Sequence, residues 1–228
     1  MCGRFTLVSP VEVVARHFGL ASTPPLAAHY NIAPSQPVAV VRESGDGRRE
    51  LGFMRWGLVP PGADPRRIGA RLINARSETV DTQPAFRAAF RSRRCLMPAD
   101  GFFEWQRARG RGQPFYAQMR DRGPFAFAAL WERSEGQGRE PIESCTLLTT
   151  EPNAALRDIH ERMPVILDPA AYELWLSDRA QDAAALKALL VPYPAEAMSV
   201  RAVSTLVNDP RNDGPECIAP VPFTPRLL

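Results

Sequence analysis

The sequence predicts an α+β fold in which a β-rich, barrel-like and mostly antiparallel core is covered by several helices. Nine short runs are rich in β-branched and aromatic residues, and four stretches show the apolar spacing of an amphipathic helix. No Gly/Ser linker or internal repeat divides the chain, and its 23 prolines are spread over the connections. We therefore expect one compact domain over residues 1–228.

The first helix is predicted from the capping pattern of Ser9, Pro10 and Glu12 and is expected to stop at Gly19. Three further helices are predicted over Gln83–Arg91 and in the stretches that follow Asp168 and Asp182. The apolar stripes behind these predictions comprise Val11, Val14, Ala15, Phe18, Phe86, Phe90, Tyr172, Trp175, Leu186 and Leu190. Each helix is expected to cover the sheets.

The strands are predicted from short β-rich runs bounded by turn residues. These runs are Pro37–Arg42, Leu51–Met54, Arg94–Met97, Phe102–Trp105, Phe115–Met119, Phe125–Leu130, Cys145–Thr150, Met163–Leu167 and Met198–Val203. The segment Gly45–Arg49 is expected to be a hairpin tip, and Arg107–Gly112 is expected to be another.

Composition excludes several classes of protein. With 45% hydrophobic and 23% charged residues, the chain resembles an ordinary globular domain. It contains no apolar run near the roughly 20 residues that a membrane span needs, and its start does not resemble a signal peptide. We therefore expect a cytoplasmic protein with no membrane partner. The four cysteines are widely separated, so neither a disulfide framework nor a metal site is predicted.

The formal net charge of +3 conceals an uneven distribution. Residues 66–122 carry 13 bases and 5 acids, a balance of +8, whereas residues 123–228 carry 9 bases and 15 acids, a balance of −6. A basic middle in a nearly neutral protein favours a local patch for a polyanion. A solvated charged face would leave the same pattern.

The second residue has distinctive chemistry if Met1 is removed. Cys2 would then carry a free α-amine, ordinarily of pKa about 7.7 to 8.0, beside a thiol. Such an aminothiol condenses with an aldehyde to an imine, and the sulfur then closes a five-membered thiazolidine. From its position alone, Cys2 could equally be a buried thiol, since cysteine is among the most buried residue types.

Three other polar residues stand in suggestive contexts. Asn74 follows an apolar pair, Glu104 lies in a run of aromatic residues, and His160 precedes a β run. Desolvation by aromatic neighbours favours a neutral carboxyl, as general acid–base catalysis requires. Each residue taken singly also fits a surface or core position. A zinc-protease reading of His160 fails because Pro164 occupies the place of the second histidine.

Six motifs taken together resemble the SRAP family, whose members are abasic-site processing proteins that crosslink to single-stranded DNA. The resemblance covers the chain from Cys2 to about Pro220. The motifs are Cys2–Phe5, Tyr30–Pro34, Arg55–Pro60, Asn74–Thr79, Pro98–Trp105 and His160–Pro164, followed by a C-terminal stretch around Asn208 and Asn212–Glu216.

The resemblance implies that Cys2, freed of Met1, captures an abasic site as a thiazolidine. It implies further that Asn74 orients the amine or sugar, that Glu104 moves protons, and that His160 assists imine formation and reversal. The other implied DNA-binding residues are Arg4, Arg76, Arg162, Trp56 and Trp105. The expected partner is single-stranded DNA containing an abasic site. We expect a monomer that uses no cofactor and no metal and that is associated with the nucleoid when bound to DNA.

Two departures and two alternatives remain at this point. Pro60–Asp64 lacks the tryptophan that some relatives use as a wedge against the duplex. Pro84 stands where the resemblance implies a basic residue, so one phosphate contact is either missing or supplied by Arg87. The first alternative is a cysteine peptidase that uses Cys2, His160 and Asn74. The second is a noncovalent single-strand-binding module that uses the basic middle and aromatic residues.

Overall fold

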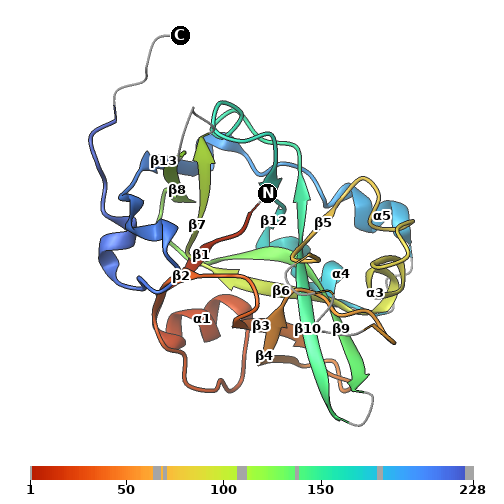
Figure 1. The fold of residues 1–228 in the computed structure, drawn as a ribbon. Helices are drawn as coiled ribbons and strands as arrows, with labels where there is room; N and C mark the ends of the chain where they lie inside the picture. Colours follow the sequence, from red (N-terminus) through yellow and green to blue (C-terminus); the bar gives the residue numbers. More distant parts are fainter. Residues whose placement is uncertain are drawn as a thin grey trace.

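The computed structural model describes residues 2–63, 68, 71–106, 112–136, 139–178 and 182–223. Its strands form two sheets, with short helices at the periphery (Figure 1). Of the expected hairpin tip Arg107–Gly112, only Gly112 belongs to the described residues, and Met1 lies outside them as well.

The first sheet is antiparallel throughout and holds the start of the chain. Its strand order is β13 (Met198–Ala202), β8 (Gln113–Met119), β7 (Gly101–Gln106), β1 (Phe5–Leu7) and β2 (His29–Ile32). Phe5 pairs with Phe102 on β7 and with Ile32 on β2. The N-terminal strand is therefore held between two neighbours, which fixes the residues just before it.

The second sheet has eight strands and closes into a barrel. Its order is β11 (Met163–Pro164), β10 (Arg139–Thr150), β4 (Arg49–Trp56), β3 (Pro37–Glu43), β6 (Arg94–Ala99), β9 (Phe125–Gly136) and β12 (Ile166–Leu167), with β5 (Asn74–Arg76) beside β10. Because β9 also pairs with β10, the path through β4, β3 and β6 returns to its start. Among the strands of the described residues, only the pairings of β10 with β4 and β5 are parallel. The predicted barrel-like, mostly antiparallel core is confirmed.

Each of the nine predicted β runs contains a strand, although Val203 lies just beyond β13 and forms an isolated bridge with Pro220, and one run is divided. At Val165 the chain leaves β10 and joins β9, because the Val165 N–H donates to Leu148 O and the Val165 carbonyl accepts from Ala128 N. The predicted run 163–167 therefore becomes β11 and β12. The short strands β1, β2 and β5 were not predicted.

The helices are short and lie on the outside. They are α1 (Val11–Phe18), α3 (Arg87–Ser92), α4 (Tyr172–Leu176) and α5 (Ala183–Ala188), with 3₁₀ turns η1 (Pro169–Ala171), η2 (Ala195–Ala197), η3 (Thr205–Asn208) and η4 (Pro215–Ile218). Gly19 ends α1 with φ +66°, as predicted, and Asp182 caps α5. The predicted Ser9 cap is wrong: Pro10 precedes the helix, and Ser9 instead donates to the Asp100 carboxylate. The helix expected from Gln83 begins only at Arg87, after a series of turns.

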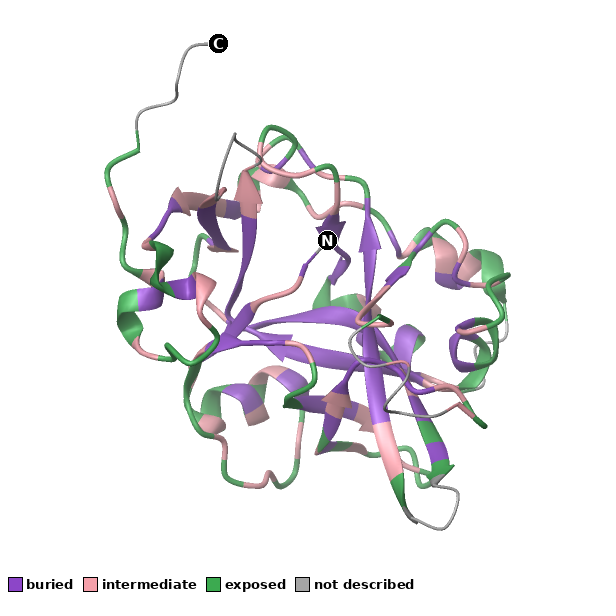
Figure 2. Ribbon diagram, viewed as in Figure 1, coloured by how far each residue is buried: buried purple, intermediate pink, exposed green. Residues whose placement is uncertain are grey.

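The core joins the two sheets beneath the N-terminus. Phe5 packs edge-on against Trp56 at 5.3 Å between ring centroids and against Phe127 at 5.8 Å, so β1 is anchored to the barrel. Figure 2 shows buried strands at the centre of the molecule and exposed residues mainly in the helices and loops. Within the described ranges, no helix combines the length and apolar character needed to cross a bilayer.

Candidate active site

Cys2 lies just before β1 and is fully buried. Its Sγ is 3.7 Å from the carbonyl oxygen of Arg4, to which the thiol donates. Burial raises the pKa of the Cys2 thiol well above its ordinary value, and the carboxylate of Glu104 raises it further. The thiol therefore keeps its proton in this environment, and its use as a nucleophile requires a nearby base.

Asn74 is the first residue of β5, and its side chain contacts the backbone of Cys2. β5 runs parallel to β10, with Asn74 opposite Leu147, and this pairing fixes the amide. The Asn74 Nδ2 donates to the Cys2 carbonyl oxygen at 2.9 Å. The Asn74 Oδ1 atom is buried and has no hydrogen-bond partner in the described part of the chain. Asn74 thus holds Cys2 through its donor and leaves its acceptor available.

Glu104 lies in the middle of β7, where it pairs with Phe115 of β8. Its side chain is almost completely buried, with neighbours in the strand that include Phe103 and Trp105. Burial raises the pKa of Glu104 from 4.5 to about 7 because the carboxylate is desolvated. The direction is the one expected from the aromatic run, and it makes Glu104 both a usable acid and a usable base near neutral pH.

His160 faces Glu104 from the loop before β11. Its Nε2 is 4.0 Å from the Glu104 Oε2, and only 11% of its side chain is exposed. The backbone N–H of Arg162 lies 3.0 Å from His160 Nδ1, and the Arg162 carbonyl oxygen lies 3.2 Å from the same nitrogen. The amide can only donate and the carbonyl can only accept, so the two contacts call for opposite tautomers, and we assign Nδ1 as the acceptor in the shorter contact. The neutral ring then carries its proton on Nε2, directed at Glu104.

The four predicted catalytic residues therefore lie in one neighbourhood. Asn74 contacts Cys2 and His160 faces Glu104, while the Glu104 charge acts on the Cys2 thiol. Figure 1 shows the N-terminus between β7 and β5, the strands that carry Glu104 and Asn74. A carboxyl that titrates near neutrality, an imidazole and a thiol in this arrangement can move protons during an addition to a carbonyl group.

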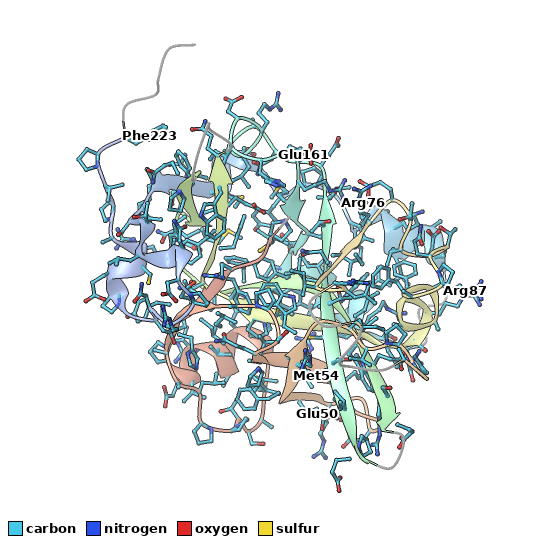
Figure 3. The ribbon with its side chains drawn as sticks, in the orientation of Figure 1. Glu50, Met54, Arg76, Arg87, Glu161 and Phe223 are labelled. Carbon is cyan, nitrogen blue, oxygen red and sulfur yellow. The ribbon has the colours of Figure 1, made fainter. Side chains whose placement is uncertain are left out.

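The predicted phosphate ligands differ in how far they are already engaged. Arg4 donates to Asn31 Oδ1 at 2.9 Å, to the Val207 carbonyl at 2.6 Å and to the Asn208 carbonyl at 3.5 Å. It therefore fastens the C-terminal segment to β1 and β2, and its expected phosphate contact stays a prediction. The Arg76 side chain is exposed, makes no hydrogen bond within the described residues, and lies on the same side of the view as Glu161 (Figure 3).

Arg162 is paired within the protein. Its Nη1 donates to Glu78 Oε1 at 2.6 Å and its Nη2 to Glu78 Oε2 at 3.0 Å, while Nη2 also donates to the Thr149 carbonyl at 2.5 Å. The Arg162 hydrogen bonds lower the pKa of Glu78. Glu78 is a residue that the sequence reasoning missed, although it lies inside the Asn74–Thr79 motif. Its position two residues after Arg76 was the available signal.

The two predicted tryptophans have different environments. Trp56 is fully buried and donates from Nε1 to the Ile73 carbonyl at 3.0 Å, so neither face of its ring is open to a base. The expected DNA contact by Trp56 is corrected by this burial, and the residue supports the core below the site. Trp105 is half-buried and donates from Nε1 to Asn208 Oδ1 at 2.7 Å.

Neither disulfide chemistry nor metal chemistry has an evident place among the described side chains. Cys2, Cys95, Cys145 and Cys217 are free and buried. In the ranges that the structure describes, no three His, Cys, Asp or Glu side chains gather as a metal site would require.

Comparisons with known proteins agree on one family. A model of the family described as SOS response associated peptidase (SRAP) matches residues 1–210. The chain is 41% identical over 222 residues to abasic site processing protein YoqW of Bacillus subtilis (strain 168), across 96% of this chain and 99% of YoqW. It is 30% identical over 237 residues to abasic site processing protein HMCES of Pongo abelii, across 86% of this chain and 66% of HMCES.

One solved structure has the same fold. A crystal structure of a protein from Bacteroides thetaiotaomicron aligns with a TM-score of 0.85 and covers 96% of this chain and 100% of that chain. At 23% identity, this likeness supports the fold alone.

Proposed function

Because this chain belongs to the SOS response associated peptidase family, we propose that it processes abasic sites in single-stranded DNA by covalent capture at Cys2. The relatives YoqW and HMCES are named abasic site processing proteins, which supports the abasic site as the substrate. The observation that carries the proposal is the buried Glu104, whose pKa of about 7 places a proton donor and acceptor beside both Cys2 and His160.

The proposed reaction begins with removal of Met1, which gives Cys2 a free α-amine. The amine nitrogen attacks the aldehyde carbon of the ring-opened abasic sugar, and loss of the carbonyl oxygen as water leaves an imine. The sulfur of Cys2 then bonds to the imine carbon, the thiol proton passes to a base, and the imine nitrogen takes up a proton. One water is released and no atom is oxidised or reduced overall.

Each of the other site residues has a task in this sequence. Protonated Glu104 supplies the proton with which the carbinolamine oxygen leaves as water, and ionised Glu104 takes the proton of the Cys2 thiol. His160 holds its Nε2 proton toward Glu104 and can exchange it during formation and reversal of the imine. Asn74 fixes the Cys2 backbone through Nδ2 and leaves Oδ1 for the reacting amine or sugar hydroxyl.

Two features support a role for the DNA backbone in binding. Residues 66–122 carry an excess of eight positive charges, and Arg76 presents an exposed guanidinium, without a hydrogen bond in the described part of the chain, two residues from Asn74. By contrast, a papain-like peptidase requires its imidazole to activate the thiol. In this structure the Cys2 thiol donates to Arg4 O while His160 Nε2 faces Glu104, so the arrangement favours capture over peptidase chemistry.

The decisive experiment mixes the protein, with Met1 removal checked by mass, with single-stranded DNA that contains one abasic site. We expect an adduct that survives a denaturing gel, and no adduct with the intact strand. Equal adduct yields on both strands would refute capture of the lesion. Cleavage of peptides by the same preparation would support the peptidase, and salt-dependent binding without an adduct would support the noncovalent module.

A further inference from the structure

A carboxylate occupies the place where Arg162 would bind a phosphate. The two Glu78 oxygens accept from Nη1 and Nη2 of Arg162 at 2.6 and 3.0 Å, a two-pronged contact. A guanidinium binds two phosphate oxygens with the same fork geometry. A carboxylate and a phosphate therefore compete for the same face of this side chain.

The surroundings decide which partner of the pair can move. Arg162 is only 16% exposed in its side chain and is anchored by its second contact, from Nη2 to the Thr149 carbonyl. The same carbonyl accepts from Ser77 N at 2.9 Å, which ties the segment before Glu78 to β10. The Glu78 side chain is 51% exposed and ends in water. Glu78 can therefore turn away while Arg162 stays in position.

Glu78 also lies close to two of the arginines that are predicted to bind phosphate. Arg162 follows His160 by two residues and Arg76 follows Asn74 by two, so both arginines belong to the segments that carry the site. The charges of both arginines act on the Glu78 carboxylate. A strand that brings its lesion to Cys2 would pass a phosphate near a carboxylate that repels it.

We propose that Glu78 is a built-in competitor of the DNA phosphate, because it occupies the anion-binding face of Arg162 in the free protein and is displaced when a single strand binds. The inference rests on the proposed function and adds a residue that limits how tightly any strand binds before capture. Competition weakens binding to every strand, whereas covalent capture retains only the strand that carries an abasic site. Glu78 thus helps the protein leave undamaged DNA.

The test is the binding of an undamaged single-stranded oligonucleotide, followed by fluorescence anisotropy over a range of salt concentrations. An exposed ion pair contributes little, so Glu78→Gln should tighten binding by roughly two- to five-fold. It should also steepen the logarithmic salt dependence by up to about 0.7, the value for one phosphate on a single strand.

Glu50→Gln is the matched control. Glu50 is also an exposed acid paired with an arginine, Arg42, at 2.7 Å, and its replacement changes the net charge equally. It lies at the opposite end of the molecule from Arg76 in Figure 3. Glu50→Gln should leave binding unchanged, and the gain from Glu78→Gln should vanish when Arg162 is replaced by alanine or lysine.

Three results would overturn the inference: equal effects of Glu78→Gln and Glu50→Gln, weaker binding by Glu78→Gln, or a gain that persists without Arg162. If the wild type binds strands and captures abasic sites while Glu78→Gln gains nothing, only the competitor is refuted. If the wild type neither binds strands nor forms the adduct, the proposed function fails as well.

Discussion

Burial of the Glu104 carboxyl has a consequence for stability that can be measured without DNA. The pKa of Glu104 is raised from 4.5 to about 7 by desolvation. The folded protein therefore holds this proton more tightly than the unfolded chain does. The resulting stability is fully present below pH 4.5 and is lost as the pH rises through about 7. Glu104→Gln keeps the shape and removes the titration, so its stability should not follow this dependence.

The magnitude follows from the size of the shift. A change from 4.5 to about 7 corresponds to about 3 kcal/mol, at 1.36 kcal/mol for each pKa unit. Relative to wild type, Glu104→Gln should therefore become more stable by about 3 kcal/mol between pH 4.5 and pH 8, with the change concentrated below about pH 7. Urea unfolding of both proteins at half-unit pH steps measures this difference directly.

Glu78→Gln serves as the comparison in the same assay. Its hydrogen bonds with Arg162 lower the pKa of Glu78, so the stability that it contributes is lost only as the pH falls below its ordinary value of 4.5. The difference between wild type and Glu78→Gln should be flat from pH 5 to pH 8. A flat difference for Glu104→Gln across the same range would refute the argument that the folded protein desolvates this carboxyl.

Four further predictions test the site and its support. Cys2→Ala should abolish the thiazolidine, whereas Cys2→Ser should retain an imine that borohydride can trap. If Lys187→Ala removed the trapped species, the attacking amine would be the Lys187 side chain and not the α-amine of residue 2. Asn74→Leu should slow adduct formation at least about tenfold with a melting temperature near that of wild type, because the amide positions Cys2 and carries an unpaired acceptor. Arg76→Ala should reduce the slope of binding against salt by about 0.7, and an unchanged slope would remove it from the DNA path. Arg94→Met should destabilise the fold by at least about 3 kcal/mol in urea unfolding, since Arg94 donates to buried carbonyls at the ends of α3 and α4.

The barrel was predictable because its long strands carry their own signal. The run Phe125–Leu130 lies inside β9, and Cys145–Thr150 forms the end of β10, both rich in residues that favour strands. The strands that escaped prediction have three or four residues and exist through distant partners. Asn74–Arg76 becomes β5 only because it lies beside Leu147–Thr149, and no local pattern records that pairing.

The sequence motifs predicted which residues belong to the site. They did not predict the tertiary contacts that determine what each of these residues binds. Burial of the Glu104 strand could be expected from its aromatic neighbours, and the raised pKa agrees with it. Arg4 and Arg162 look identical in sequence to free phosphate ligands. Arg4 instead binds the Val207 carbonyl, and Arg162 binds Glu78. A motif indicates which side chains are near the site, but the partner that each arginine finds depends on the folded chain.

Two energetically unfavourable features of this fold lie where the reaction is proposed. Asn74 Oδ1 is a buried acceptor without a partner in the described chain, and burial disfavours the charged form of Glu104. An unpaired buried acceptor costs about 1 to 3 kcal/mol, so it persists only where another requirement maintains it. A reacting amine or sugar hydroxyl would give Asn74 Oδ1 its missing donor. In the proposed capture, the substrate would supply the hydrogen-bond donor that Asn74 Oδ1 lacks in the free protein. The free energy gained from this hydrogen bond then favours the complex with the lesion.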